Sequence, residues 1–181
     1  MTGGEVSEGA QAYAQSLPVP GVMTVKARLK LADGSWGPLS NATFSTGVPA
    51  DASNLRISEI HFHPSDASPA EVAAGFDNAD EFEFIELVNI AQTPIDLTAV
   101  RFEQMVSGNE LAGIAFDFGA AQVRSLAAGE RVVIVEDLEA FGQRYGTHHP
   151  VAGQWDGGLS NAGERLRLVA GDQLIAEFAY S

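Results

Sequence analysis

The chain has 181 residues, of which 45% are hydrophobic and 19% charged, and its formal net charge is −14. This composition allows a packed core and argues against wholesale disorder. The absence of cysteine excludes disulfides, thiolate zinc sites and thiol nucleophiles. Lys26 and Lys30 are the only lysines, so nucleic acid and anionic membrane surfaces are not expected partners. No apolar run is long enough to insert into a membrane.

The first predicted elements form a hairpin. Apolar and polar residues alternate over 22–31, as in a half-buried strand. The pair Asp33 and Gly34 is a hairpin turn signal, and residues 40–44 are the predicted return strand. Residues 48–54 are rich in Pro, Ala, Ser and Asn and show no periodicity, which predicts a linker.

A longer run of strands follows the linker. Gly171 and Asp172 lie between two apolar runs and predict a tight hairpin near the end of the chain. Many short strands separated by turn residues are typical of a β-sandwich or barrel. The predicted strands are 55–62, 81–89, 95–106, 113–118, 130–136, 164–170 and 173–180.

Two short helices interrupt the strands. Residues 68–75 begin with Ser68 as the N-cap, followed by proline, and end at glycine. Residues 137–146 begin with Asp137 as the N-cap and also end at glycine. Neither helix is long enough to be stable alone, so we expect both to pack against the sheets.

Four segments in the second run of strands resemble the lamin tail domain family, in its bacterial branch. They are LRISEIHFHP, EFIELVN followed by PIDLTAV, LAAGERVVIVEDLEAFGQRYG, and WDGGLSNAGERLRLVAGDQLIAEFAYS. The resemblance covers roughly residues 53–181 and implies an immunoglobulin-like β-sandwich. Relatives usually carry a Gly-Trp pair where this chain has Ala99 and Val100. We therefore predict an all-β protein of this sandwich type with one or two short helices.

The N-terminal part is similar to the end of another small β-module, which occurs at the C-terminus of chitobiase-like enzymes. The similarity lies in TVKARL, Trp36 and ATF, and the earlier strands of that module are missing. The predicted organisation is a partial β-module over 1–47, a linker over 48–54 and a lamin-tail-like domain over 55–181.

Two histidines raise the question of a zinc site. His61 and His63 alternate on one predicted strand and share a face with Glu59, and imidazole suits zinc. His148 and His149, from a later loop, could complete a site. The alternative, which we favour, is a strand whose histidines are bystanders. Apolar residues interrupt the alternation, so the buried face is expected to switch at a bulge.

An acidic stretch offers a calcium alternative. Asp77, Asn78, Asp80 and Glu81 place oxygen ligands on one loop, although the glycine and distal glutamate of an EF-hand are missing. The favoured alternative is a solvated acidic loop. Glu86 lies inside an apolar strand, and we expect it to have a hydrogen-bonding or positively charged partner in a structural role.

No motif supplies a nucleophile together with its base, and no glycine loop of the phosphate-binding type is present. We therefore predict a non-catalytic interaction module without a cofactor, which binds a protein or glycan partner. The family resemblance implies a larger bacterial protein that is exported or lies at the cell surface. The alternatives are a calcium-dependent binding or adhesion module and, less favoured, a metal-dependent hydrolase built on His61 and His63.

Overall fold

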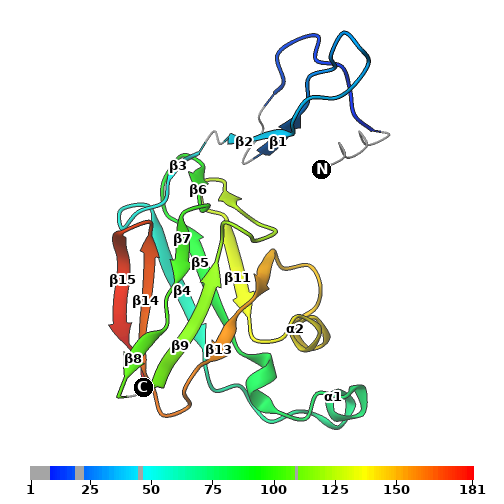
Figure 1. Ribbon diagram of the computed structural model, residues 1–181. Coiled ribbons are helices and arrows are strands. Elements are labelled where there is room, and N and C mark those ends of the chain that lie inside the picture. Colours follow the sequence, from blue (N-terminus) through cyan, green and yellow to red (C-terminus); the bar gives the residue numbers. More distant parts are fainter. Residues whose placement is uncertain (1–8, 19–22, 45–46, 109) are drawn as a thin grey trace. The chain divides into compact units, whose positions relative to one another are not determined.

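The computed structural model describes residues 9–18, 23–44, 47–108 and 110–181, and the chain divides into two compact units, residues 1–46 and 47–181 (Figure 1). In the first unit, β1 (Met23–Ala27) and β2 (Ser40–Phe44) form the predicted antiparallel hairpin. No described residue of this unit is buried, so the described part of the hairpin has no core of its own.

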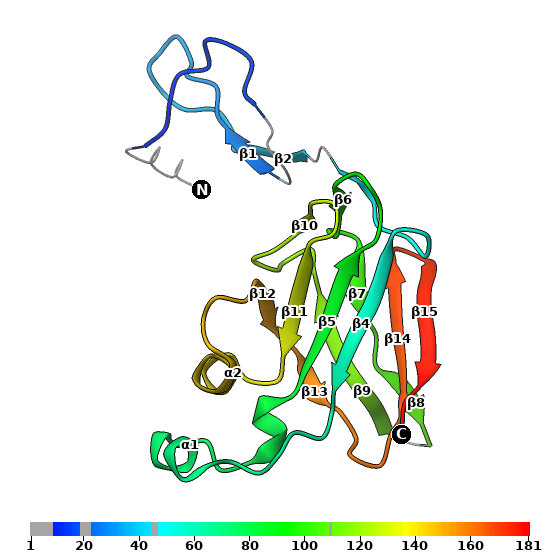
Figure 2. The ribbon, with the colours of Figure 1, turned by 180° about the vertical axis from the view of Figure 1, so that it is seen from behind.

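The second unit is built from two main sheets that face each other (Figures 1 and 2). One has the order β12–β11–β5–β4, in which β11 and β12 are parallel and the other pairs antiparallel. The other has the order β13–β9–β7–β14–β15, with β8 also paired to β9. A small sheet of β10, β6 and β3 completes the unit.

The strands of the second unit have the following bounds: β3 Val48–Pro49, β4 Leu55–His61, β5 Phe84–Asn89, β6 Ile95–Asp96, β7 Val100–Phe102, β8 Met105–Ser107, β9 Glu110–Asp117, β10 Ser125–Leu126, β11 Arg131–Val135, β12 Val151–Gln154, β13 Asp156–Gly158, β14 Arg165–Ala170 and β15 Gln173–Ala179.

The core lies between the two main sheets. Ile85 on β5 and Ile134 on β11 belong to the same buried cluster as Ile114 on β9 and Leu168 on β14. Every second residue of β5 is buried, because successive side chains of a strand point to opposite faces. Two sheets packed over a shared apolar core make an immunoglobulin-like sandwich, which confirms the predicted fold class.

Both predicted helices are present, and a short 3-10 helix is added. They are α1 (Pro69–Ala74), α2 (Leu138–Tyr145) and η1 (Ala79–Phe82). Ser68 and Glu71 form a capping box at the start of α1, and the Asp137 side chain accepts two backbone N–H groups at the start of α2. Among the described residues, no helix is both long and apolar enough to cross a membrane.

An ion pair joins the two helices. Arg144 on α2 donates from Nε to Glu71 Oε1 and from Nη2 to Glu71 Oε2, at 2.8 and 2.9 Å. Both side chains are about nine-tenths buried. The hydrogen bonds from Arg144 and from the Ser68 backbone lower the pKa of Glu71 to about 2.

The structure differs from the predicted elements in three places. Val48–Pro49 pair with Ile95–Asp96, so residues predicted as linker contribute a strand to the second unit, which begins at Gly47. The predicted strand 95–106 is divided by a turn in which the Val100 N–H donates to the Leu97 carbonyl. The predicted strand 81–89 starts only at Phe84, because η1 occupies the preceding residues.

Asn89 and Val100 show how two sequence landmarks serve the core. The fully buried Asn89 amide donates to the carbonyls of Thr93, Leu126 and Ala127, so it joins two segments of the chain at the end of β5. Val100 is also fully buried and belongs to the main core cluster.

Candidate functional site

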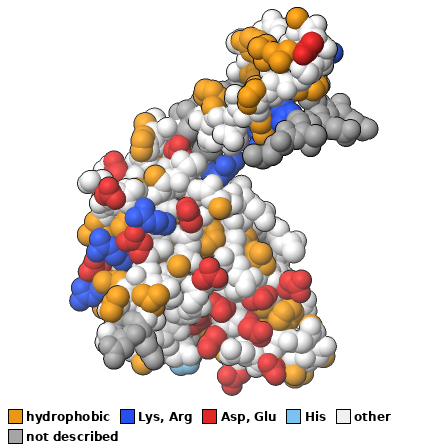
Figure 3. Space-filling view, viewed as in Figure 1, with side chains coloured by type: hydrophobic (Ala, Val, Ile, Leu, Met, Phe, Trp, Pro, Cys, Tyr) orange, Lys and Arg blue, Asp and Glu red, His pale blue; other side chains and the backbone are white. Residues whose placement is uncertain are grey.

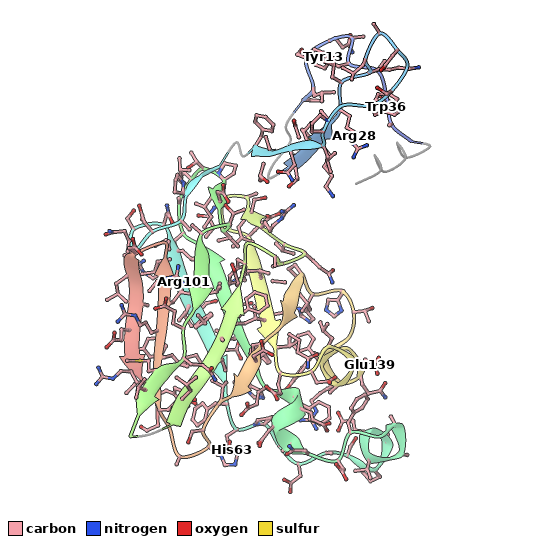
Figure 4. The ribbon with its side chains drawn as sticks, viewed as in Figure 1. Tyr13, Arg28, Trp36, His63, Arg101 and Glu139 are labelled. Atoms are coloured by element: carbon pink, nitrogen blue, oxygen red, sulfur yellow. The ribbon has the colours of Figure 1, made fainter. Side chains whose placement is uncertain are left out.

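His61 packs among aromatic rings. Its imidazole stacks on Phe84 of β5 with ring centroids 5.0 Å apart and meets the edge of Tyr145 at 6.2 Å. His63 lies two residues beyond the end of β4 and is exposed (Figure 4). The predicted switch of the buried face is confirmed, because the pairing of β4 with β5 shifts register between Ile57 and Glu59.

His148 and His149 lie together on an exposed loop, with ring centroids 4.0 Å apart. The His149 ring also contacts Phe141 of α2 at 5.9 Å. Across the described ranges, no group of three His, Cys, Asp or Glu side chains is arranged to hold a metal ion. The zinc site stays a prediction.

Three of the four predicted calcium ligands have hydrogen-bonding roles within the protein. Asn78 caps η1 by accepting from the Asp80 N–H, and Glu81 accepts from the Asn78 N–H, both at 3.2 Å. Asp80 Oδ1 accepts from Asn161 Nδ2 at 3.0 Å, and Asp77 is exposed. These contacts give the loop a capping role, and calcium binding there stays a prediction.

Glu86 has the partners expected for a carboxylate on a strand. It forms an ion pair with Arg131 of β11 and accepts a hydrogen bond from the Ser58 hydroxyl of β4 at 2.6 Å. The expected hydrogen-bonding and positively charged partners of Glu86 are both present. The face it occupies is the less buried face of β5, opposite the fully buried Ile85 and Leu87.

A pair of acidic residues that we did not single out in the sequence lies inside the sandwich. The Glu136 N–H donates to the Glu83 carbonyl at 3.1 Å, which extends the β5–β11 ladder by one pair. Glu83 is on the same side of its strand as Ile85, and Glu136 on the same side as Ile134, so both carboxyl groups face the main core. Glu83 is only 1% exposed.

One oxygen of each carboxyl group of this pair lacks a protein donor. Glu83 Oε1, Glu136 Oε2 and the indole Nε1 of Trp155 are buried without a hydrogen-bond partner. Trp155 lies beside the pair, since its backbone N–H donates to the Val135 carbonyl at 3.1 Å. Buried polar groups are nearly always hydrogen-bonded, so three such atoms together mark an unusual site.

The neighbouring loop 159–164 has a hydrogen-bonded cluster of its own. The Tyr180 hydroxyl donates to Glu164 Oε1 at 3.0 Å and accepts from the Ser160 N–H at 2.9 Å. Burial raises the pKa of Tyr180, and Glu164 contributes to that rise. This loop therefore places a further carboxylate near the pair, while the Leu159 backbone N–H opposes the rise in the pKa of Glu83.

Burial and like charges act on the pair together. Desolvation is the main cause that raises the pKa of Glu83 to about 8, and the charges of Asp80 and Glu136 add to it. Burial also raises the pKa of Glu136, and the indole of the neighbouring Trp155 partly offsets this rise although it does not meet the geometry of a hydrogen bond. A group with such a pKa is expected to hold a proton at neutral pH.

The sequence does contain a signal for this pair. Glu83 lies at an even spacing from the apolar Ile85 and Leu87, so the three share one face of a strand. Glu136 shares a face with Val132 and Ile134 in the same way. The alternation of apolar residues in the sequence therefore shows that each acid lies on the buried face of its strand. It does not show their direct pairing, because that depends on how two distant strands align.

Two hollows lie on the surface of the second unit. The first, of about 390 Å³, lies between β4 and β15 and is lined by Arg56, Ile57, Ser58, Glu59, Ile60, Ala176 and Phe178. We call it the edge groove. The second, of about 560 Å³, lies mainly along β9 and β12, and its lining includes Arg101, Phe116, Asp117, Gln122, Gln154 and Asp156. Neither is lined by Glu83 or Glu136.

Charge is unevenly distributed over the second unit. Figure 3 shows acidic side chains gathered over the end that carries α1, η1 and α2, and basic ones over β14 and β15. The basic group includes Arg165 and Arg167, which both pair with Glu177 of β15. The acid pair therefore lies at the end where negative charge is concentrated.

The geometry defines an immunoglobulin-like β-sandwich whose buried acids line neither of these surface hollows. The family model of the lamin tail domain matches residues 48–181, and the chain belongs to that family. This is a family of non-enzymatic, immunoglobulin-like domains. No curated protein and no solved structure gives a significant match to the chain.

Proposed function

We propose that the chain is a non-catalytic interaction module of a larger bacterial exported or surface protein, and that it binds an extended segment of a protein partner. Membership in a family of non-enzymatic, immunoglobulin-like domains supports this class of function. The edge groove is the observation that supports binding of an extended segment.

The edge groove lies between the outer strands of the two main sheets. Among the described strands, β4 pairs only with β5 and β15 pairs only with β14, so each has an edge without a neighbouring strand. Such an edge is a template for a strand from another chain. Each of the two strands has one register shift, in β4 between Ile57 and Glu59 and in β15 between Leu174 and Ala176, so the regular part of each edge is short.

The lining of the edge groove favours a partner with alternating apolar side chains. An added strand gains main-chain hydrogen bonds, and its alternate side chains enter pockets. Ile60 and Phe178 are only partly buried and offer apolar contacts, while Arg56 and Glu59 carry opposite charges beside them. We therefore propose an extended, largely apolar segment of mixed charge.

The proposal is tested with the full chain and a display library of random peptides. Ala176→Glu places a charged side chain in the edge groove, whereas Leu111→Glu makes the same kind of change on an exposed apolar residue of β9. We expect peptides enriched on the parent to bind the Ala176→Glu variant at least about tenfold more weakly, since about 1.4 kcal/mol corresponds to that factor. Binding to Leu111→Glu should be unchanged.

Circular dichroism of both variants establishes that they are folded. Enriched peptides that bind Ala176→Glu as tightly as the parent would remove the edge groove from the proposal. So would a library that yields no binders at all.

A glycan is the second candidate partner, and the hollow along β9 and β12 favours it. The partly exposed Phe116 ring lies there with the planar polar groups of Asp117 and Gln154, a mixture that suits a polar ligand with apolar faces. Binding to a glycan array that is lost in Gln154→Ala would favour this reading. A calcium-dependent module remains the third candidate and is addressed by the melting experiment below.

A further inference from the structure

The acid pair carries an inference that does not depend on the proposed partner. We propose that Glu83 and Glu136 share one proton in the folded protein at neutral pH, and that its loss loosens the end of the sandwich that they occupy. The pair is thereby a pH-responsive element of the fold.

The strand pairing brings the two carboxyl groups together. Glu83 and Glu136 are direct cross-strand neighbours, with the Glu136 N–H bonded to the Glu83 carbonyl. Side chains of such pairs start about 5 Å apart, and like charges in this position are destabilising. Both side chains extend toward the main core, where water is scarce, so two full charges are further disfavoured.

One shared proton removes both the repulsion between two like charges and the cost of burying two charges. A protonated carboxyl group of one residue donates its O–H to a carboxylate oxygen of the other, and the pair then carries a single negative charge. This hydrogen bond would provide partners for Glu83 Oε1 and Glu136 Oε2, which otherwise have none. On ionisation the proton leaves to solvent, and two negative charges remain side by side.

The surroundings supply more negative charge and no described cation. Asp80 and Glu81 act on the pair from η1, Asp137 from the start of α2, and Glu164 from the loop before β14. The neutral polar groups nearby are the Leu159 backbone N–H, which favours the charged form of Glu83, the Trp155 indole and the Tyr180 hydroxyl. Arg144 of α2 contacts η1, where its guanidinium stacks over the Phe82 ring at 3.4 Å. Its charge is paired with Glu71.

A proton fits the pair better than a divalent metal ion. Calcium takes six to eight oxygen ligands, and the described residues contain no arrangement of three ligating side chains. A proton needs only the two oxygens that the pair supplies.

The elements beside the pair determine what its ionisation would disturb. Trp155 is 4% exposed next to Glu136, and the Tyr180 hydroxyl holds the loop at Ser160. A second negative charge between them repels Glu164 and is stabilised by water entering this end of the sandwich. Trp155 therefore reports the change.

The experiment follows the fluorescence of Trp155 through a pH titration. Trp36 is the second tryptophan, so Trp36→Phe is the parent background. Glu83→Gln removes the shared proton, and Glu86→Gln is the matched control, since Glu86 lies on the opposite face of the same strand with Arg131 and Ser58 as partners. We expect a fluorescence transition centred near pH 8 in the parent and in Glu86→Gln, and none in Glu83→Gln.

Two further measurements keep the proposal open to refutation if Glu83→Gln does not fold. Infrared spectra of the folded parent should show the C=O stretch of a protonated carboxyl group at neutral pH, which disappears as the pH rises above the transition. Melting with EDTA or calcium should give the same melting temperature.

Three results would overturn the proposal: a transition that persists in Glu83→Gln, an absent carboxyl band, or a calcium-specific rise in melting temperature that Glu83→Gln abolishes. The last would assign the pair to calcium instead.

Discussion

Two buried glutamates twelve positions apart behave in opposite ways. Glu71 is 8% exposed and has a pKa of about 2, whereas Glu83 is 1% exposed and has a pKa of about 8. Glu71 receives two hydrogen bonds from Arg144 and one from the Ser68 N–H. Glu83 lies among other acids. The difference shows that burial alone does not determine whether a carboxyl group is charged, because its partners decide.

The largest expected effect on stability comes from removing Arg144, the positively charged partner of Glu71. Arg144→Met keeps an unbranched side chain over Phe82, removes the guanidinium and leaves the Glu71 carboxylate buried without its partner. Loss of one partner of a buried ion pair costs about 3–5 kcal/mol in the free energy of unfolding. Urea unfolding at neutral pH measures it. A loss below about 1 kcal/mol would mean that Glu71 is not held by this arginine.

The next largest effect is on how the free energy of unfolding depends on pH. The pKa of Glu71 is lowered in the folded state, so its contribution is present above pH 4.5 and is lost as the pH falls toward 2. Glu83 has the opposite sign, since its contribution is present below pH 4.5 and is lost as the pH rises through 8. Each contributes a slope of at most about 1.4 kcal/mol per pH unit.

Urea unfolding of Glu71→Gln at a series of pH values isolates the first of these slopes. The variant should be less stable than the parent at neutral pH, and the gap should narrow as the pH falls from 4.5 toward 2. A gap of constant size over this range would show that Glu71 keeps an ordinary pKa in the folded protein.

The smallest effect is expected at an exposed ion pair. Arg165→Ala removes one of two arginines from Glu177, and the Arg165 side chain is 60% exposed. Exposed pairs contribute about 0–1 kcal/mol, and salt screens them. The loss should therefore vanish in unfolding experiments at high salt. A loss comparable to that of Arg144→Met would contradict the link between burial and the strength of the pair.

Local chemistry explains which parts of the fold could be predicted. The caps Ser68 and Asp137 act within one turn of the chain, so both helices are readable from the sequence. The strands β10, β12 and β13 are short and were not predicted, because long-range pairing stabilises them rather than any pattern of their own. The sequence predicts a linker at Val48–Pro49 for the same reason, since their strand exists only through pairing with Ile95–Asp96.

The candidate site was harder to predict than the fold. The predicted zinc and calcium residues stand out by type, yet the described contacts of His61 are aromatic and those of Asn78 are helix caps. Glu83 and Glu136 are 53 positions apart in the chain and become neighbours only through the register of β5 and β11. Residue type alone does not reveal such a pair.

The small strand β3 has a mechanical consequence for a domain that follows another unit in the chain. The Val48 N–H donates to the Pro94 carbonyl and the Ala50 N–H to the Asp96 carbonyl, at 3.1 and 3.0 Å. Within the second unit, β3 lies at one end and the C-terminus at the other (Figure 1). Tension along the chain between Gly47 and Ser181 therefore loads these two bonds at one end and the pairing of β15 with β14 at the other, so β3 and β15 are the first strands to bear the force.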